Sequence, residues 1–188
     1  MRLQPGEPAP DFALTTLKGE SLTLADLRGA PVWMAFSRFA SCPLCNYRVH
    51  QMIGEWPARY ADYNFRLFNV FQSPSSKLDD YVAKQEPPFD LVADHPSMGL
   101  YEKYGLESSV KAAFSMDVMK TMVAAAKIGL PLVRPFEGPA FRVPADFLID
   151  SEGILRVVFY GATIAEHIPF EQADAFLAQY ATKRAVAS

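Results

Sequence analysis

Residues 32–45 read VWMAFSRFASCPLC, and the change of pattern inside this stretch decides the fold. The segment Val32–Phe36 is short and mostly apolar, which indicates a buried strand. After Cys42 the apolar residues recur at helical intervals. Pro43 suits the first turn of a helix because an N–H group there has no intrahelical partner to lose. Both cysteines of the chain, Cys42 and Cys45, therefore lie at a junction between a strand and a helix.

The cysteine pair predicts redox chemistry. Unpaired N–H groups and the dipole at a helix start favour a thiolate at Cys42, and a thiolate is the nucleophile of thiol exchange. Cys45, one helical turn later, is placed to attack a mixed disulfide or a sulfenic acid formed on Cys42. Two small buried side chains, or half of a zinc site, are the alternatives. Zinc would need further ligands, and His50, His95 and His167 are not at paired ligand spacing, so we expect no metal.

The segments around this junction predict a mixed α/β sheet with helices on both faces. The first two expected strands and the helix between them form a βαβ unit, which makes those strands parallel neighbours. The last two strands form an antiparallel hairpin. We expect strands at residues 32–36, 65–71, 89–92, 147–149 and 155–160, and helices after Cys42 and at 76–84, 96–104, 110–126 and 170–183. Residues 1–188 are expected to form a single domain with a helical insert at about 107–138.

Length and composition narrow the class of protein. The chain has 188 residues, of which 50% are hydrophobic, enough to bury a large core without metal or disulfide cross-links. Its formal net charge of −3, with mixed signs, gives no footprint for nucleic acid or anionic lipid. The proline-rich start lacks the apolar region of a secretory signal, and no apolar stretch approaches the ~20 residues that cross a bilayer. We therefore expect a cytoplasmic protein that binds neither nucleic acid nor membrane.

Further segments of the chain carry a resemblance to known proteins. Residues 143–150 (VPADFLID) and the hairpin at Gly153, together with the strand before the CPxC helix, resemble the thioredoxin fold, in which a cis-proline loop faces the cysteine pair. Residues 6–12 (GEPAPDF) resemble the N-terminal hairpin of the peroxiredoxin-like branch of the AhpC/TSA redoxin family. Residues 91–94 (LVAD) and 101–105 resemble the "fplLaD…YG" region of the same family. The resemblance covers most of the chain except the insert.

The resemblance implies roles for particular residues. It makes Cys42 and Cys45 the redox pair, Pro144 the cis-proline, and Val143 the residue whose backbone pairs with a bound thiol substrate. An ordinary proline at the start of a strand is the alternative for Pro144. Typical peroxiredoxins carry Pro-x-x-x-Thr/Ser-x-x-Cys, which neither cysteine matches, and Pro144 replaces the arginine that they place before the Phe-Ile-Asp strand. These departures argue against the usual peroxide-activating pocket.

Three more side chains are candidates for the substrate site. Arg38, four residues before Cys42, would lower the pKa of that thiol and stabilise a leaving oxygen or thiolate, with a loop salt bridge as the alternative. Arg142, two residues before Pro144, is a weaker candidate for the same role. Thioredoxins bury an acid six residues before the pair, where this chain has Phe36. Asp146 is therefore the candidate for proton transfer, with a purely structural role for this buried acid as the alternative.

The combined features predict a thiol-dependent oxidoreductase that reduces hydroperoxides, in which Cys42 attacks and Cys45 resolves the product as an intramolecular disulfide. A thiol-disulfide reductase acting on protein disulfides is the first alternative, and the departures from the peroxiredoxin pattern favour it. A redox-sensing binding module that presents the helical insert to a partner is the second. The methionines of the insert indicate core packing or a dimer contact more than a binding surface.

The expected partners follow from the same features. The chain has no nucleotide loop, haem motif or flavin fingerprint, so we expect no bound cofactor. Electrons should then come from an external thiol of the thioredoxin or glutathione type. The family resemblance adds a homodimer to these expectations.

Overall fold

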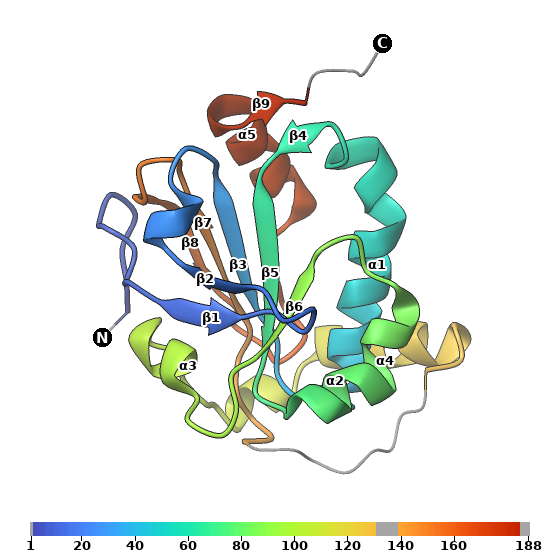
Figure 1. The fold of residues 1–188 in the computed structure, drawn as a ribbon. Helices are drawn as coiled ribbons and strands as arrows, with labels where there is room; N and C mark the ends of the chain where they lie inside the picture. The colour runs from blue at the N-terminus through green and yellow to red at the C-terminus, as the bar shows by residue number, and fades with distance from the viewer. Residues whose placement is uncertain (1, 131–138, 185–188) are drawn as a thin grey trace.

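A five-stranded sheet forms the centre of the protein in the computed structural model, which describes residues 2–130 and 139–184 (Figure 1). The strand order is β6-β5-β3-β7-β8, and β3 pairs in parallel with β5 and antiparallel with β7. The expected mixed sheet is thereby confirmed. Its strands are β3 (Val32–Phe36), β5 (Arg66–Phe71), β6 (Asp90–Ala93), β7 (Ala145–Ile149) and β8 (Leu155–Tyr160).

Helices cover both faces of this sheet because successive strand residues point to opposite sides. Trp33 and Leu148 pack in one core with α1 and α5, whereas Met34 and Phe147 pack in the other with α3. Figure 1 shows α1 on one side of the sheet and α3 on the other. The helices are α1 (Pro43–Arg59), α2 (Ser75–Tyr81), α3 (Gly99–Lys103), α4 (Met116–Lys127) and α5 (Phe170–Tyr180), with short 3-10 turns η1 (Ala25–Leu27), η2 (Ala83–Gln85) and η3 (Lys111–Ala113). Within the described residues, none of these helices is both long and apolar enough to span a bilayer.

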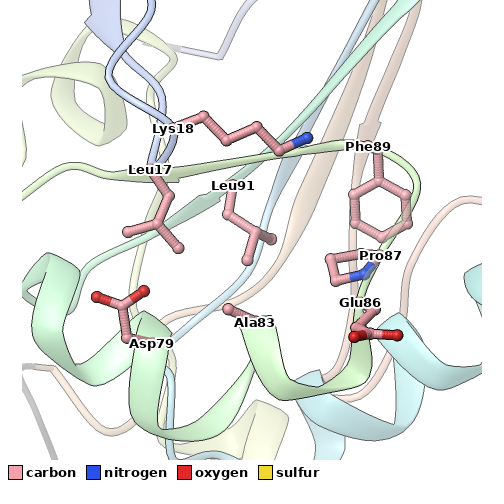
Figure 2. Close-up of a pocket in the computed structure, with 8 residues that line it drawn as sticks. All are labelled: Leu17, Lys18, Asp79, Ala83, Glu86, Pro87, Phe89 and Leu91. Atoms are coloured by element: carbon pink, nitrogen blue, oxygen red, sulfur yellow. The ribbon is translucent and has the colours of Figure 1, made fainter.

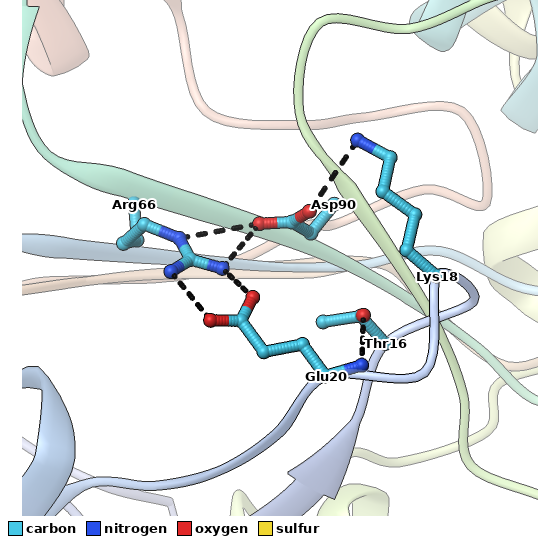
Figure 3. Close-up of polar contacts among 5 residues, drawn as sticks. All are labelled: Thr16, Lys18, Glu20, Arg66 and Asp90. Carbon is cyan, nitrogen blue, oxygen red and sulfur yellow. Dashed lines mark hydrogen bonds and ion pairs between the residues drawn. The ribbon is translucent and has the colours of Figure 1, made fainter.

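An N-terminal hairpin, β1 (Ala13–Thr15) and β2 (Ser21–Thr23), covers the free edge of β6. Its loop donates the Leu17 N–H to the Leu91 carbonyl at 2.7 Å. Charged side chains reinforce this contact: the guanidinium of Arg66 on β5 bonds Glu20 and Asp90, each at 2.7 Å (Figure 3). Exposed ion pairs contribute little stability, so the backbone hydrogen bonds at the sheet edge contribute more to holding the hairpin in place.

The last helix ends earlier than the sequence predicted, at Tyr180 rather than Lys183. Ala181 leaves the helical conformation for an extended one, at φ −101° and ψ 142°. The next residues then form β9 (Thr182–Lys183), which pairs antiparallel with β4 (Tyr63–Asn64) beyond the end of α1. Backbone pairing with a distant segment, which is invisible to local periodicity, therefore overrides the helical pattern.

The insert is also less regular than its spacing predicted. The expected continuous helix breaks after η3, and α4 starts anew because the Ser115 hydroxyl accepts the Val118 N–H at 3.2 Å. The α4 helix packs against α1, but Phe114, Met116 and Met119 are 80%, 69% and 63% exposed. The prediction of core packing is therefore wrong for Met116 and Met119, whereas Met122 is half-buried. Residues 131–138 of the predicted insert lie outside the described part of the chain.

Gly161, which follows β8, is a position where backbone contacts exclude any side chain. Its N–H donates to the Pro144 carbonyl at 3.0 Å, and an added Cβ would lie 2.5 Å from the Glu166 carbonyl oxygen. We expect Gly161→Ala to lower the free energy of unfolding by about 1–3 kcal/mol. Gly54→Ala, in open space on α1, should instead raise it by about 0.5–1 kcal/mol because alanine loses less backbone entropy. Urea unfolding measures both changes, and equal stability of Gly161→Ala and wild type would contradict the expectation.

Candidate active site

The N-terminus of α1 holds the cysteine pair at the end of the central strand. Cys42 is the residue that caps the helix, with φ −65° and ψ 120°, and its sulfur accepts the backbone N–H of Cys45 at 3.4 Å. Pro43 follows in the first turn, as predicted. Both cysteines are free thiols with 1% of their surface exposed. The redox candidates thus lie at the strand-to-helix junction, closed off from bulk solvent.

Arg38 lies directly against both sulfurs. Its Nη1 donates to Cys42 Sγ at 3.5 Å, while its backbone N–H donates to Cys45 Sγ at 3.4 Å. The side chain is buried, and its Nη2 donates to the carbonyl of Ala140. The loop salt bridge considered as its alternative is absent among the described residues, where no carboxylate pairs with this guanidinium. Arg38 therefore supplies a buried positive charge to the thiol site.

The pKa values of the two thiols are shifted in opposite directions. Burial acts to raise the pKa of Cys42, but the hydrogen bond with Cys45, the charge of Arg38 and the backbone N–H groups of the helix start outweigh it and bring the pKa to about 7. Burial raises the pKa of Cys45 well above its ordinary value, and the neighbouring Cys42 sulfur raises it further. At neutral pH the thiolate is therefore far more populated at Cys42 than at Cys45, so Cys42 is the better nucleophile of the two.

The segment just before β7 folds over this site and is already engaged with its own chain. The Pro139 carbonyl accepts a hydrogen bond from Gln72 Nε2 at 3.1 Å, beside the bond from Arg38 to Ala140. The Val143 N–H donates to the Glu107 carbonyl at 3.1 Å. The start of the insert therefore occupies the Val143 N–H, and the pairing of the Val143 backbone with a substrate stays a prediction.

The prediction of a cis bond at Pro144 is also wrong. The cis peptide bond of the described chain joins His95 and Pro96, and the bond before Pro144 is trans. Pro144 instead fits the ordinary alternative: it directly precedes the first residue of β7, where it has no N–H to lose from the ladder, and its carbonyl accepts the Gly161 N–H. The proline-strand pattern specifies a strand start but not the isomer.

In the described part of the chain, Arg142 makes no hydrogen bond to either cysteine sulfur. Its guanidinium carbon is 4.8 Å from the ring centre of Tyr101, and its nitrogens donate to the Leu106 carbonyl at 3.5 Å and to Met98 Sδ at 3.8 Å. Its Nε is buried without a hydrogen-bond partner, and no contact among the described residues supports the prediction that Arg142 acts directly on the thiols.

Asp146 is fully buried and has structural partners rather than a cysteine. Its carboxylate accepts hydrogen bonds from Trp33 Nε1 at 2.9 Å and from the Ile168 N–H at 3.0 Å, and it faces His167 Nδ1 at 3.2 Å. Burial acts to raise the pKa of Asp146, but His167, Arg48 and the Ile168 N–H outweigh it, so the pKa lies below its ordinary value. The sequence alone assigned no role to His167. The only signal for this contact was that a buried acid such as Asp146 needs a partner.

Several pockets lie elsewhere on the described surface. A hollow of about 250 Å³ at the β6 edge is lined by Leu17, Leu91 and Phe89, with Ala83 and Pro87 of the η2 region opposite (Figure 2). Another, of about 430 Å³, lies along residues 113–122 of the insert. Neither lining includes a cysteine or a predicted site residue. In residues 2–130 and 139–184 there is also no group of three or more His, Cys, Asp or Glu side chains that would hold a metal ion.

Arg38→Ala tests the electrostatic role of the guanidinium. Loss of the charge beside the sulfur should raise the pKa of Cys42 from about 7 by about one unit, measured as the pH midpoint of alkylation. Arg38→Lys should retain most of the lowering because the charge is kept. Arg142→Ala is the matched control and should leave the midpoint in place. An unchanged midpoint in Arg38→Ala would exclude the role.

Asp146→Asn tests whether that acid serves the fold or the thiols. A lowered pKa in the folded state means that the carboxylate stabilises the protein above its unfolded pKa of about 4, and that this stability is lost as pH falls through the folded pKa. The variant should therefore unfold about 1–3 kcal/mol more easily at neutral pH and lose less stability on acidification. Asp117→Asn, whose side chain is 75% exposed, is the control. A shifted alkylation midpoint of Cys42 in Asp146→Asn would instead assign the acid to the thiol chemistry.

Comparisons with known proteins identify the fold and the family. Among solved structures, the chain is similar to peroxiredoxin Q from Xanthomonas campestris, at 18% identity and a TM-score of 0.57, over 94% of this chain and 93% of that one. A peroxiredoxin-like protein from Aquifex aeolicus gives 13% identity and a TM-score of 0.62, over 95% and 88%. The thioredoxin domain of a thiol-disulfide oxidoreductase from Bacteroides vulgatus gives 18% and 0.53, over 93% and 99%. These likenesses show a thioredoxin-like fold.

The search of curated proteins gave no match. The model of the AhpC/TSA family matches residues 5–158, which include both cysteines, Arg38 and Asp146 but not His167. The family and the structural neighbours are oxidoreductases, in agreement with the redox role expected from the cysteine pair. The match spans most of the sequence, and the chain therefore belongs to the AhpC/TSA family.

Proposed function

We propose that the protein reduces hydroperoxides with the dithiol Cys42 and Cys45. The observation that carries the proposal is the split in acidity within one helical turn: the pKa of Cys42 is lowered to about 7 beside Arg38, while that of Cys45 is raised. One sulfur is thus ready to attack at neutral pH, and the other keeps its proton until an oxidised partner is present.

The burial of the site favours a small substrate. Each cysteine is 1% exposed, and the carbonyls of Pro139 and Ala140 are bonded to side chains of the site. A hydroperoxide needs only a narrow opening, whereas a protein disulfide would need an extended backbone to approach the sulfur. The Val143 N–H, where such a backbone was expected to pair, is taken by Glu107. Arg38 also supplies a positive charge at Cys42, where chemistry on a peroxide develops a negative oxygen.

The reaction balances in two steps. The Cys42 thiolate attacks one peroxide oxygen: an S–O bond forms, the O–O bond breaks, and the alkoxide or hydroxide that leaves takes a proton from solvent. The Cys45 sulfur then attacks the sulfenic sulfur: an S–S bond forms, the S–O bond breaks, and water leaves with the thiol proton. An external dithiol of the thioredoxin type, or two thiols of the glutathione type, then returns two electrons and two protons, regenerates both thiols and leaves as a disulfide.

The second candidate is thiol-disulfide exchange on protein disulfides. The absence of the Thr or Ser that peroxiredoxins place three residues before the cysteine favours it, because Phe39 occupies that position before Cys42. The same split in thiol acidity would serve this reaction, with a mixed disulfide in place of the sulfenic acid. Redox sensing through the insert has the exposed side chains of Phe114, Met116 and Met119 in its favour.

Peroxide oxidation followed by intact mass separates these functions. The reduced protein should lose two hydrogens rapidly on adding hydrogen peroxide, as one disulfide forms. Cys45→Ser should gain one oxygen and react with a sulfenic-acid trap, whereas Cys42→Ser should react far more slowly because the remaining thiol is mostly protonated at neutral pH. Slow oxidation by peroxide together with rapid oxidation by a disulfide would overturn peroxide reduction in favour of exchange.

A further inference from the structure

One peptide unit links the resolving cysteine to a buried tyrosine. The N–H end of the Ser37–Arg38 peptide donates to Cys45 Sγ at 3.4 Å. The carbonyl end of the same unit, on Ser37, accepts the Tyr101 hydroxyl at 2.8 Å. Because a peptide is planar and rigid, fixing its carbonyl fixes the direction of its N–H. Tyr101 is therefore connected to Cys45 by two hydrogen bonds through a single amide.

The hydroxyl of Tyr101 lies where the central strands separate. The Ser37 N–H makes the bond that follows the paired residues of β3 and β5, to the Val70 carbonyl at 2.9 Å, and the Tyr101 oxygen lies 2.9 Å from that same carbonyl. The phenol has one proton to share between two carbonyls, so it bridges the strand ends just before the chain turns to α1. No water replaces this bridge readily, because Tyr101 is fully buried.

The position of Tyr101 is itself fixed from several sides. Asp94 accepts the backbone N–H of Leu100 at 2.7 Å and that of Tyr101 at 3.2 Å, which holds the start of α3. The ring meets Phe36 edge-on, with centres 5.2 Å apart, and Arg142 lies over the ring. This packing leaves the hydroxyl a single direction, toward the end of β3.

We propose that Tyr101 is a positioning residue for the resolving step: its hydroxyl orients and polarises the Ser37–Arg38 amide, which holds Cys45 and assists its attack on the intermediate carried by Cys42. The inference rests on the dithiol function proposed above and adds a residue to it. Hydrogen bonds in a chain strengthen one another, so a carbonyl that accepts the phenol makes the N–H at the other end of its peptide a better donor. A better donor stabilises the developing thiolate of Cys45.

The charged and titratable groups around Cys45 support this assignment. Burial dominates and raises the pKa of Cys45, Cys42 on the same helix raises it further, and Arg38 lowers it through its charge and its backbone N–H. Tyr101 on α3 interacts electrostatically with Cys45, Arg142 lies over its ring, and Asp94 accepts its backbone N–H. Of these groups, only the Arg38 amide is connected to Tyr101 through the Ser37 carbonyl.

The test uses a symmetric aromatic disulfide that releases a coloured thiolate at each step. Cys42 attacks first: a mixed disulfide forms on Cys42 and one aromatic thiolate leaves. Cys45 then loses its proton to solvent and attacks the Cys42 sulfur of the mixed disulfide, so that the Cys42–Cys45 disulfide forms and a second thiolate leaves. Stopped-flow absorbance thus reports the resolving step separately from the attack, whether the physiological substrate is a peroxide or a disulfide.

Tyr101→Phe should leave the first step unchanged and raise the pH midpoint of the second by about half a unit. The second rate at neutral pH should fall only about two-fold, because a more basic thiolate is also more nucleophilic. Tyr104→Phe is the matched control: Tyr104 is equally buried and also packs on Phe36, but its hydroxyl bonds the Pro10 carbonyl at 3.3 Å. This control should match wild type in both steps.

Three outcomes would overturn the assignment. A Tyr101→Phe variant with a wild-type midpoint shows that the amide needs no tyrosine. Equal slowing of both steps, or the same shift in Tyr104→Phe, shows a general packing effect. A wild-type protein that releases a single thiolate has no Cys42–Cys45 exchange, which removes the proposed function together with the inference. If Tyr101→Phe does not fold, a second experiment decides: Cys45 is alkylated at a series of pH values in a Cys42→Ser background with fluorotyrosine in place of tyrosine. Fluorotyrosine is a stronger phenol donor and should lower the pH midpoint of alkylation. An unchanged midpoint overturns the proposal.

Discussion

The central place of β3 in the sheet is the constraint on which the site depends. Its parallel partner β5 and antiparallel partner β7 fix the last residue, Phe36, on both sides, at Val70 and Ala145. The chain therefore leaves the sheet from a rigid point and enters α1 within a few residues. A helix that starts there points its free N–H groups at the sulfur of its own capping residue, Cys42. The geometry of the thiol site is in this sense a consequence of strand pairing.

Burial and local charge act against each other at the two sulfurs, and the balance differs by position. Both thiols are desolvated, which alone would keep both protonated at neutral pH. Cys42 receives the helix-start N–H groups and the Arg38 guanidinium, so its thiolate is favoured, whereas Cys45 lies one turn inside the helix and next to that negative sulfur. A dithiol with equal acidities would expose both sulfurs to oxidants at once. In the proposed reaction, the unequal pair lets Cys42 react first while Cys45 stays protonated.

The sequence specified the junction well because its signals are local. A short apolar strand, a helical period and Pro43 in the first turn predicted the position of Cys42 and Cys45 without any long-range information. The same reasoning placed β7 and β8 and their hairpin. It failed at the C-terminus, where β9 pairs with a distant segment and replaces a helical turn. It also did not foresee that the Val143 N–H is bonded to Glu107.

Side-chain partners separated by long stretches of sequence were equally hidden. The bond between Tyr101 and Ser37 spans 64 residues, and the contact between His167 and Asp146 spans 21 and crosses a strand and a loop. No spacing rule predicts either contact, although each belongs to a side chain whose burial demands a partner. The isomer at Pro144 was a different kind of failure, because a proline at a strand start is compatible with both isomers and the sequence pattern does not choose between them.

The position of the buried acid has a consequence for proton transfer. Phe36 occupies the place on β3 where thioredoxins carry an acid, and its ring packs with Tyr101 and Phe147 on the face opposite α1. Asp146 is on the α1 face, but its hydrogen bonds run to Trp33, nearer the start of β3, and to the loop that precedes α5. Neither residue accepts a proton from Cys45 in this arrangement. The proton must leave through solvent, the substrate or the departing oxygen, so the resolving sulfur depends on neutral dipoles such as the Arg38 amide rather than on a buried base.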